Sequence, residues 1–186
     1  MKKILALVMA AILALSLVAC GGSDKVTLKI LDTEYAVEDY AICVAKENTQ
    51  LLDDINAALA ELTADGTTKA IVDKYISGVE HNLVFQADAE GKEEIHMATN
   101  AQFPPYESLN GTDVVGFDPD MMKAVCDKLG YELKIENMDF DSIIAAVDSG
   151  KADVGVAGMT VTEDRLKSID FTDSYTTATQ VIIVRK

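Results

Sequence analysis

The sequence predicts an α/β fold: a mostly parallel, five-stranded sheet with helices on both faces. Two observations favour it. From residue 95 onward, apolar strand-like runs alternate with segments of helical period, in the order IHMATN, DPDMMKAVCDKLG, YELKIENM, DFDSIIAAVDSG, ADVGVAG. Strands that alternate with helices covering them are typical of parallel sheets with right-handed crossovers. The 186-residue chain is also long enough for a domain with a real core.

The first residues, MKKILALVMAAILALSLVAC, combine two lysines with an apolar run and a cysteine. The run is too short to be trusted as a membrane span, so residues 1–19 are predicted to be a secretory signal peptide. The last four residues, LVAC, resemble the bacterial lipobox, in which cleavage leaves the cysteine at the N-terminus carrying lipid. We therefore expect a lipid on Cys20, a tether over residues 20–26 and a location on the extracytoplasmic face of the cell membrane. The alternative is an ordinary signal peptide or N-terminal anchor with an incidental cysteine.

Two strands and two helices are expected between the tether and residue 76. VTLKIL alternates like a strand, and YAICVA has the composition of a more buried one. From Asn48 the apolar residues recur at helical spacing, with Thr49 as the expected N-cap and Gly66 as the stop. TTKAIVDKYI then continues as a second helix.

Residues 77–94 are polar and are predicted to be a linker. They contain one apolar island, LVF, which either docks on the core or forms a short edge strand; periodicity does not decide between the two. Beyond the linker, YESLNGTDVVGF is expected to be a hairpin around Asn110 and Gly111.

The stretch GMTVTEDR contains one of only two arginines in a chain with 31 acidic residues. GMT follows the strand ADVGVA, and TNAQFPPY follows the strand IHMA, so both loops should open on the same sheet edge, where such folds bind ligands. Thr160 and Glu163 fit a capping box, which predicts a helix start near Thr160. A helix N-terminus and Arg165 together suit a carboxylate. The alternative for Arg165 is an ion pair with Asp164, Asp170 or another of the many acidic residues.

Composition excludes several classes of function. A formal net charge of −15 argues against nucleic acid and anionic lipid surfaces as partners. His81 and His96 have no metal-type spacing, and no phosphate-binding Gly-rich loop, zinc motif or nucleophile–base pair stands out, so we expect no metal, no cofactor and no enzyme. Cys43 and Cys126 lie in apolar patterns typical of buried thiols. The alternative is a disulfide between them, which an exported protein can form.

Several motifs resemble the polar amino-acid family of ABC-transporter solute-binding proteins, which have the type II periplasmic-binding-protein fold. They are FPPY, GFDPDMM, DFDSIIAAVDSGKADV, GMTVTEDR and IDFTDSY, all within the first lobe of that family. Residues 27–76 resemble the segment with which the family ends, so the order is inverted and the body of the second lobe is absent. The resemblance implies a circularly permuted single lobe over residues 27–186, with the family's C-terminal segment at 27–76, a linker at 77–94 and the N-terminal lobe segment at 95–186.

The resemblance also implies a half-pocket for an amino acid. Arg165 corresponds to the arginine that pairs with the ligand α-carboxylate, helped by the backbone N–H and hydroxyl of Thr160. Gly158 would offer its carbonyl to the ligand ammonium.

Four further positions complete the implied pocket. Phe103 and Phe140 would flank the ligand side chain, while Asn100 and Ala157 would line it. Phe103 is alternatively a stiffener of its proline-rich loop, and Phe140 a simple core residue. Because the position of Asn100 is often acidic in the family, selectivity for a cationic side chain stays open.

The function expected from these features is that of a lipid-anchored amino-acid-binding component of an ABC uptake system, whose partner is the permease. A lone lobe leaves one wall of the ligand uncovered, so affinity should be weak. The alternative is a non-binding interaction or vestigial domain. In either case strands 27–31 and 181–185 leave apolar edges, which a homodimer or a separate second lobe would cover.

Overall fold

The computed structural model describes residues 27–85 and 93–186, which fall into two compact units. The larger unit spans residues 36–180, and the described part of the smaller unit consists of residues 27–35 and 181–186. The expected signal peptide, Cys20 and the tether lie outside the described residues. Within the described ranges, no helix has the length and apolar character needed to span a bilayer.

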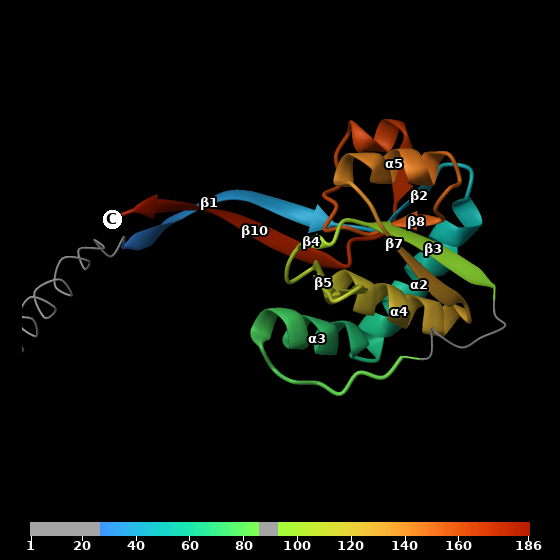
Figure 1. Ribbon diagram of the computed structural model, residues 1–186, viewed down its shortest axis with the longest axis horizontal. Coiled ribbons are helices and arrows are strands. Elements are labelled where there is room, and N and C mark those ends of the chain that lie inside the picture. The colour runs from blue at the N-terminus through green and yellow to red at the C-terminus, as the bar shows by residue number, and fades with distance from the viewer. Residues whose placement is uncertain (1–26, 86–92) are drawn as a thin grey trace, which may run out of the picture. The chain divides into compact units, whose positions relative to one another are not determined.

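A five-stranded sheet forms the centre of the larger unit, in the order β7-β3-β8-β2-β9 (Figure 1). Its strands are β2 (Cys43–Ala45), β3 (Glu94–Thr99), β7 (Glu132–Asn137), β8 (Val154–Gly155) and β9 (Ile169–Phe171). Strand β3 runs parallel to β7 and β8, whereas β2 pairs antiparallel with β8 and β9. The expected strand number is confirmed, but the sheet is mixed rather than mostly parallel, because a strand from the N-terminal half enters between two C-terminal strands in the opposite direction.

Helices cover both faces of this sheet, as expected (Figure 1). Helix α5 (Phe140–Asp148) packs on one face, and α2 (Thr49–Ala64) and α4 (Phe117–Leu129) pack together on the other. Helix α3 (Thr67–Val72) continues directly into a π-helical segment, η1 (Asp73–Ser77). Helix α2 begins at Thr49, so Asn48 takes the N-cap position expected for Thr49, without a side-chain cap bond.

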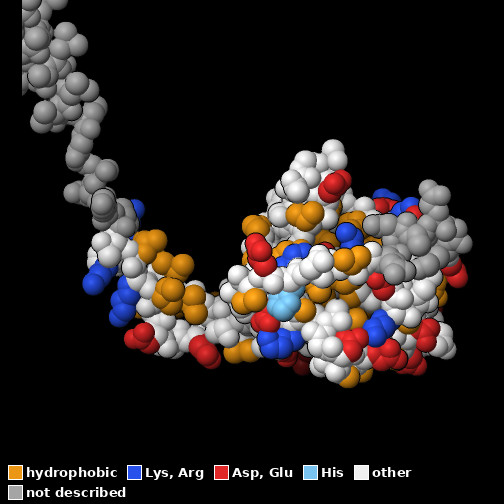
Figure 2. All heavy atoms as spheres, turned by 90° about the horizontal axis from the view of Figure 1, so that it is seen from below, with side chains coloured by type: hydrophobic (Ala, Val, Ile, Leu, Met, Phe, Trp, Pro, Cys, Tyr) orange, Lys and Arg blue, Asp and Glu red, His pale blue; other side chains and the backbone are white. Residues whose placement is uncertain are grey.

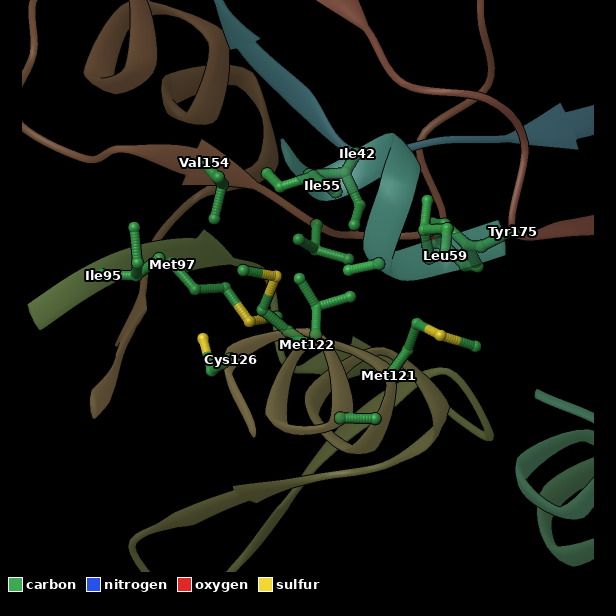
Figure 3. Close-up of a cluster of buried hydrophobic side chains, with 14 of the residues drawn as sticks. Ile42, Ile55, Leu59, Ile95, Met97, Met121, Met122, Cys126, Val154 and Tyr175 are labelled. Carbon is green, nitrogen blue, oxygen red and sulfur yellow. The ribbon is translucent and has the colours of Figure 1, made fainter. Parts of the chain in front are cut away.

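The main core fills the space between the sheet and the α2–α4 layer (Figure 3). Ile42 and Val44 belong to this core, while Cys43 between them belongs to a second cluster under α5, as the alternation of a strand requires. Cys126 lies in the main core, so the two cysteines are buried on opposite faces of the sheet and form no disulfide. Full burial of an aliphatic side chain such as Ile42 or Val44 stabilises the fold by about 1.5 to 3 kcal/mol.

A small antiparallel sheet of three strands leads into α4: β4 (Gln102–Phe103), β5 (Glu107–Asn110) and β6 (Asp113–Val115). The expected hairpin around Asn110 and Gly111 is confirmed by the pairing of Asn110 with Asp113. In the linker, the apolar island docks rather than forming a strand: Leu83 and Phe85 pack against the main core, and residues 78–85 contain no regular element.

Strands β1 (Leu28–Tyr40) and β10 (Thr176–Arg185) form a separate two-stranded sheet. Both are longer than the expected strands 27–31 and 181–185. In the smaller unit the amide of Lys186 donates to the carbonyl of Thr27 at 2.8 Å. Six large apolar side chains of this unit are exposed: Leu28, Ile30, Tyr35, Val181, Ile182 and Ile183. Figure 2 shows hydrophobic side chains gathered on the arm that the described residues form beside the grey trace.

Candidate functional site

The two loops expected at one sheet edge do meet there. Strands β3 and β8 are parallel neighbours, with Met97 opposite Val154 and Ala98 opposite Gly155, so the segments after them leave the sheet side by side. A Cβ on Gly158 would lie 2.9 Å from ring atoms of Phe103, and the φ of Gly158 is +49°. Phe103 therefore packs directly on the Gly158 backbone, and a larger residue at position 158 would displace it.

Arg165 lies half-buried beside this edge, and its guanidinium has two neighbours. Nη1 donates to the Thr160 carbonyl at 2.6 Å, and the guanidinium carbon lies 5.3 Å from the centroid of the Phe140 ring. Such a cation–π contact orients the guanidinium without neutralising it.

The alternative of an ion pair with nearby acids is not what the structure shows. Asp164 pairs with Lys167 and Asp170 with Lys46, and Arg165 forms no ion pair with any described residue. Its positive charge therefore stays available to an anionic ligand group.

The helix start expected at Thr160 is wrong. Thr160 forms an isolated antiparallel bridge with Tyr40 of β1, which holds it extended, and the only helical turn nearby is the 3₁₀ turn Arg165–Lys167. The N-cap of this turn is Asp164, without a side-chain cap bond, while Thr162 Oγ1 accepts from the Arg165 amide at 3.3 Å and the Thr162 carbonyl accepts from the Leu166 amide at 3.0 Å. A helix N-terminus is thus no part of this site.

The bridge with Tyr40 determines where the backbone N–H and C=O of Thr160 point. Hydrogen bonds from Ala41 to Met159 at 3.2 Å and from Val161 to Asp39 at 3.1 Å flank the pair of Thr160 and Tyr40. In such a non-hydrogen-bonded pair the N–H and C=O point away from the partner strand. The Thr160 carbonyl accepts from the Arg165 guanidinium, and the Thr160 amide donates to no described residue. Thr160 therefore presents a backbone N–H donor on the same side as the guanidinium that it holds.

The other expected pocket residues, Phe140, Ala157 and Asn100, lie in three different environments. Phe140 is partly a core residue and partly a site residue, because it packs, partly buried, on the second cluster and also contacts Arg165. Ala157 is buried. Asn100 donates from Nδ2 to the Met138 carbonyl at 2.8 Å and lines a pocket of about 670 Å³ with Gln102 and Lys151, among others. None of the other predicted site residues lines that pocket.

Aromatic side chains that the sequence analysis did not single out support the loop edge. Phe103, 41% exposed, stacks on Tyr106 with ring centroids 5.3 Å apart, and the buried Tyr40 meets both rings edge-on at 6.5 and 5.2 Å. The FPPY motif could have indicated Tyr106. Tyr40 comes from the N-terminal half, so no local pattern could have found it.

A buried carboxyl pair under the loops was also missed. Asp118 Oδ2 accepts from the Gly158 amide at 2.7 Å, and Oδ1 accepts from the Tyr175 hydroxyl at 3.0 Å. Glu107, also buried, is hydrogen-bonded to Asp118 through its side chain, while its Oε2 has no partner in the described structure. Burial, and next the adjacent Asp118 charge, raise the pKa of Glu107 to about 10. Within residues 27–85 and 93–186, no cluster of His, Cys, Asp and Glu could hold a metal ion.

The fold and site together define an α/β unit whose sheet edge carries an arginine without an ion-pair partner among the described residues, beside aromatic rings. Residues 95–186 match the model of the bacterial extracellular solute-binding proteins, family 3. The family consists of binding proteins rather than enzymes.

Several bacterial proteins are similar to about half of this chain. The arginine-binding extracellular protein ArtP of Bacillus subtilis is 42% identical over 52% of this chain and 38% of its own length. A probable histidine-binding protein of Neisseria gonorrhoeae is 40% identical over 48% and 34%, and the ABC transporter arginine-binding protein 1 of Escherichia coli is 35% identical over 55% and 42%. The chain thus spans about two fifths of the length of these relatives.

Solved structures with sequence similarity include an ancestral arginine-binding protein bound to glutamine and the arginine-bound form of domain 1 from TmArgBP. The first is 45% identical with a TM-score of 0.43, and the match covers 45% of this chain and 38% of that one. The second is 37% identical with a TM-score of 0.42, over 50% of this chain and 80% of that one.

Proposed function

We propose that this chain is the amino-acid-binding component of an ABC uptake system, held on the extracytoplasmic face of the cell membrane by a lipid on Cys20. The match of residues 95–186 to the solute-binding family model supports a binding role. The relatives named above bind arginine or histidine by name, so amino acids with a cationic side chain are the first candidate ligands. The macromolecular partner would be the membrane permease that receives the amino acid.

The observation that carries this proposal is the unneutralised Arg165 in a strongly acidic chain. The guanidinium is held by the Thr160 carbonyl and the Phe140 ring, while both nearby aspartates are paired with lysines. It would hold the ligand α-carboxylate, and the unused Thr160 amide would add a second donor. The Gly158 carbonyl would take the ammonium, Phe103 would face the ligand side chain, and two further residues would contribute to the wall: Asn100 and Ala157.

The proposal includes a permuted single lobe. Its support is that β2, from the segment 27–76, completes the sheet formed by the family segment 95–186, and that α2 packs on α4. The linker 77–94 would join what are the two ends of the chain in the full-length relatives. A single lobe covers one side of a ligand only, so a dissociation constant in the high micromolar range is expected.

Isothermal titration of the purified full chain with arginine, histidine and glutamate tests the binding role. Arg165→Ala is expected to weaken arginine binding roughly 100-fold, because a paired charge-assisted contact is lost. The matched control is Arg185→Ala, which removes the other arginine of the chain and should leave affinity unchanged. Agmatine, which is arginine without the carboxylate, should bind as weakly to wild type as arginine binds to Arg165→Ala. Equal affinities of the two alanine variants would contradict the role of Arg165, and no heat with any amino acid would contradict the binding function.

The exposed apolar side chains of the smaller unit favour a second role, in association. Six of them lie on the paired ends of β1 and β10, and exposed apolar side chains gathered on one segment are typical of interfaces. We propose that this ribbon, residues 27–35 and 181–186, pairs with a second copy of the chain or with a separate second lobe. If the amino-acid site proves inactive, such an interaction domain is the alternative function.

Sedimentation or light scattering measures this association directly. The purified chain is expected to form dimers that Ile183→Lys weakens at least tenfold, because a lysine in an apolar interface loses its hydration. Thr33→Lys adds the same charge at an exposed polar position of the ribbon and serves as the control. A wild-type chain that remains monomeric at high concentration would exclude the homodimer and leave the separate lobe as the partner to be sought.

A further inference from the structure

Asp118 connects three segments of the larger unit from a fully buried position. It is the second residue of α4, and its two oxygens accept hydrogen bonds from the Gly158 amide and the Tyr175 hydroxyl. It is also hydrogen-bonded to Glu107 at the start of β5. No lysine or arginine among the described residues pairs with Asp118 or Glu107, so no cation explains why a carboxylate is buried here.

The hydrogen bonds decide which of the two carboxyl groups is ionised. Two adjacent buried carboxyl groups cannot both carry a charge without a large cost. Asp118 receives an N–H and an O–H besides its contact with Glu107, and such bonds favour its charged form. Glu107 has one oxygen without a partner. Glu107 therefore keeps the proton and donates it to Asp118, leaving a single negative charge at Asp118.

We propose that Asp118 is a positioning residue for the amino-acid site: its carboxylate fixes the Gly158 amide and thereby sets the direction of the backbone that presents Gly158 and Thr160. The inference rests on the proposed function and deepens it. Gly158 has a left-handed φ of +49° and lies against the Phe103 ring, so its peptide plane needs an anchor. Two residues further on, the Thr160 carbonyl orients Arg165. The negative charge of Asp118, which holds the loop, is therefore buried below the loop and does not face the ligand carboxylate.

A second buried aspartate of the same helix gives a matched control. Asp120 accepts from Lys74 Nζ at 2.7 Å and from the Tyr75 hydroxyl at 2.8 Å, both in η1. Like Asp118, it stabilises α4 from a buried position, but its side-chain hydrogen bonds go to η1 and not to residues 156–160. A role limited to stability would make the two aspartates equivalent.

The test compares Asp118→Asn with Asp120→Asn in the full chain, using the Gly158 amide resonance and arginine affinity measured by titration. An asparagine is neutral, so the hydrogen bond from the Gly158 amide loses its charge assistance even if the amide oxygen still accepts it. Asp118→Asn is expected to move the Gly158 amide proton upfield and to weaken arginine binding about tenfold. Asp120→Asn should lower the melting temperature but leave the Gly158 resonance and the affinity at wild-type values.

Hydrogen exchange in the unmodified chain tests the geometry even if Asp118→Asn does not fold. The Gly158 amide should exchange slowly, and the Thr160 amide, which has no described partner, should exchange faster. Equal exchange of the two, or wild-type affinity and an unshifted Gly158 resonance in Asp118→Asn, would overturn the proposal. If wild type binds no amino acid, the binding function fails, yet the resonance and the exchange rates still decide whether Asp118 anchors the loop.

Discussion

Gly116→Ala is expected to destabilise the larger unit by roughly 3 to 5 kcal/mol, the sum of backbone strain and overpacking. Gly116 precedes α4 with φ +146° and ψ −171°, a region open essentially to glycine alone. A Cβ there would lie 2.1 Å from the Tyr106 carbonyl oxygen, which accepts the Asp118 amide at 3.0 Å. Relief of the clash would break that bond and shift the start of α4, so the loop edge should change together with stability.

Gly111→Ala separates the two causes of this effect. Gly111 also has a positive φ, +66°, but no atom lies within 4 Å of where its Cβ would stand. It should cost only about 1 kcal/mol, from strain alone. Chemical denaturation of both variants measures the difference. A cost for Gly116→Ala as small as that of Gly111→Ala would mean that the close approach of Tyr106 is not maintained in solution.

The stability of the wild-type chain is expected to fall as the pH rises from about 6.5 to 9, by up to about 1.4 kcal/mol per pH unit. The cause is Glu107, whose pKa burial raises from 4.5 to about 10. Between these values the folded chain keeps a proton that the unfolded chain has lost, so this contribution is complete below pH 4.5 and is lost toward pH 10. The pKa of Asp118 is raised by burial only to about 6, so its contribution lies below this window.

Glu107→Gln replaces the protonated acid by a neutral amide of the same shape, which can still donate to Asp118. The variant should show a clearly flatter pH profile in urea denaturation over the same window. His81 and His96 are present in both proteins, so the difference between the profiles isolates Glu107. Parallel profiles would show that Glu107 is ionised in the folded chain, which would remove the charge assignment on which the role of Asp118 depends.

Local patterns in the sequence predicted most of the elements. Helical spacing of apolar residues located α2, α4 and α5, and the Asn110–Gly111 pair located the hairpin. The alternation of strands and helices also placed the loops after β3 and β8 at one sheet edge. These features depend on residues a few positions apart, and their periods are set by backbone geometry.

The errors arose where a distant segment competed with a local preference. Thr160 and Glu163 have the spacing of a capping box, yet the bridge from Tyr40 holds Thr160 extended, and the nearby 3₁₀ turn has Asp164 at its N-cap instead. The strand direction in the sheet likewise depends on β2, whose position between β8 and β9 no local pattern contains.

The sequence by itself determined the element types, the buried faces and the presence of a scarce arginine in a loop beside glycine and threonine. Only the tertiary structure decided that Arg165 is left without a carboxylate partner while lysines pair with Asp164 and Asp170, and that Glu107 and Asp118 share a buried site. The physical reason is range: periodicity and turn chemistry act between neighbours, whereas ion pairing and the protonation of buried groups depend on residues that only folding brings together.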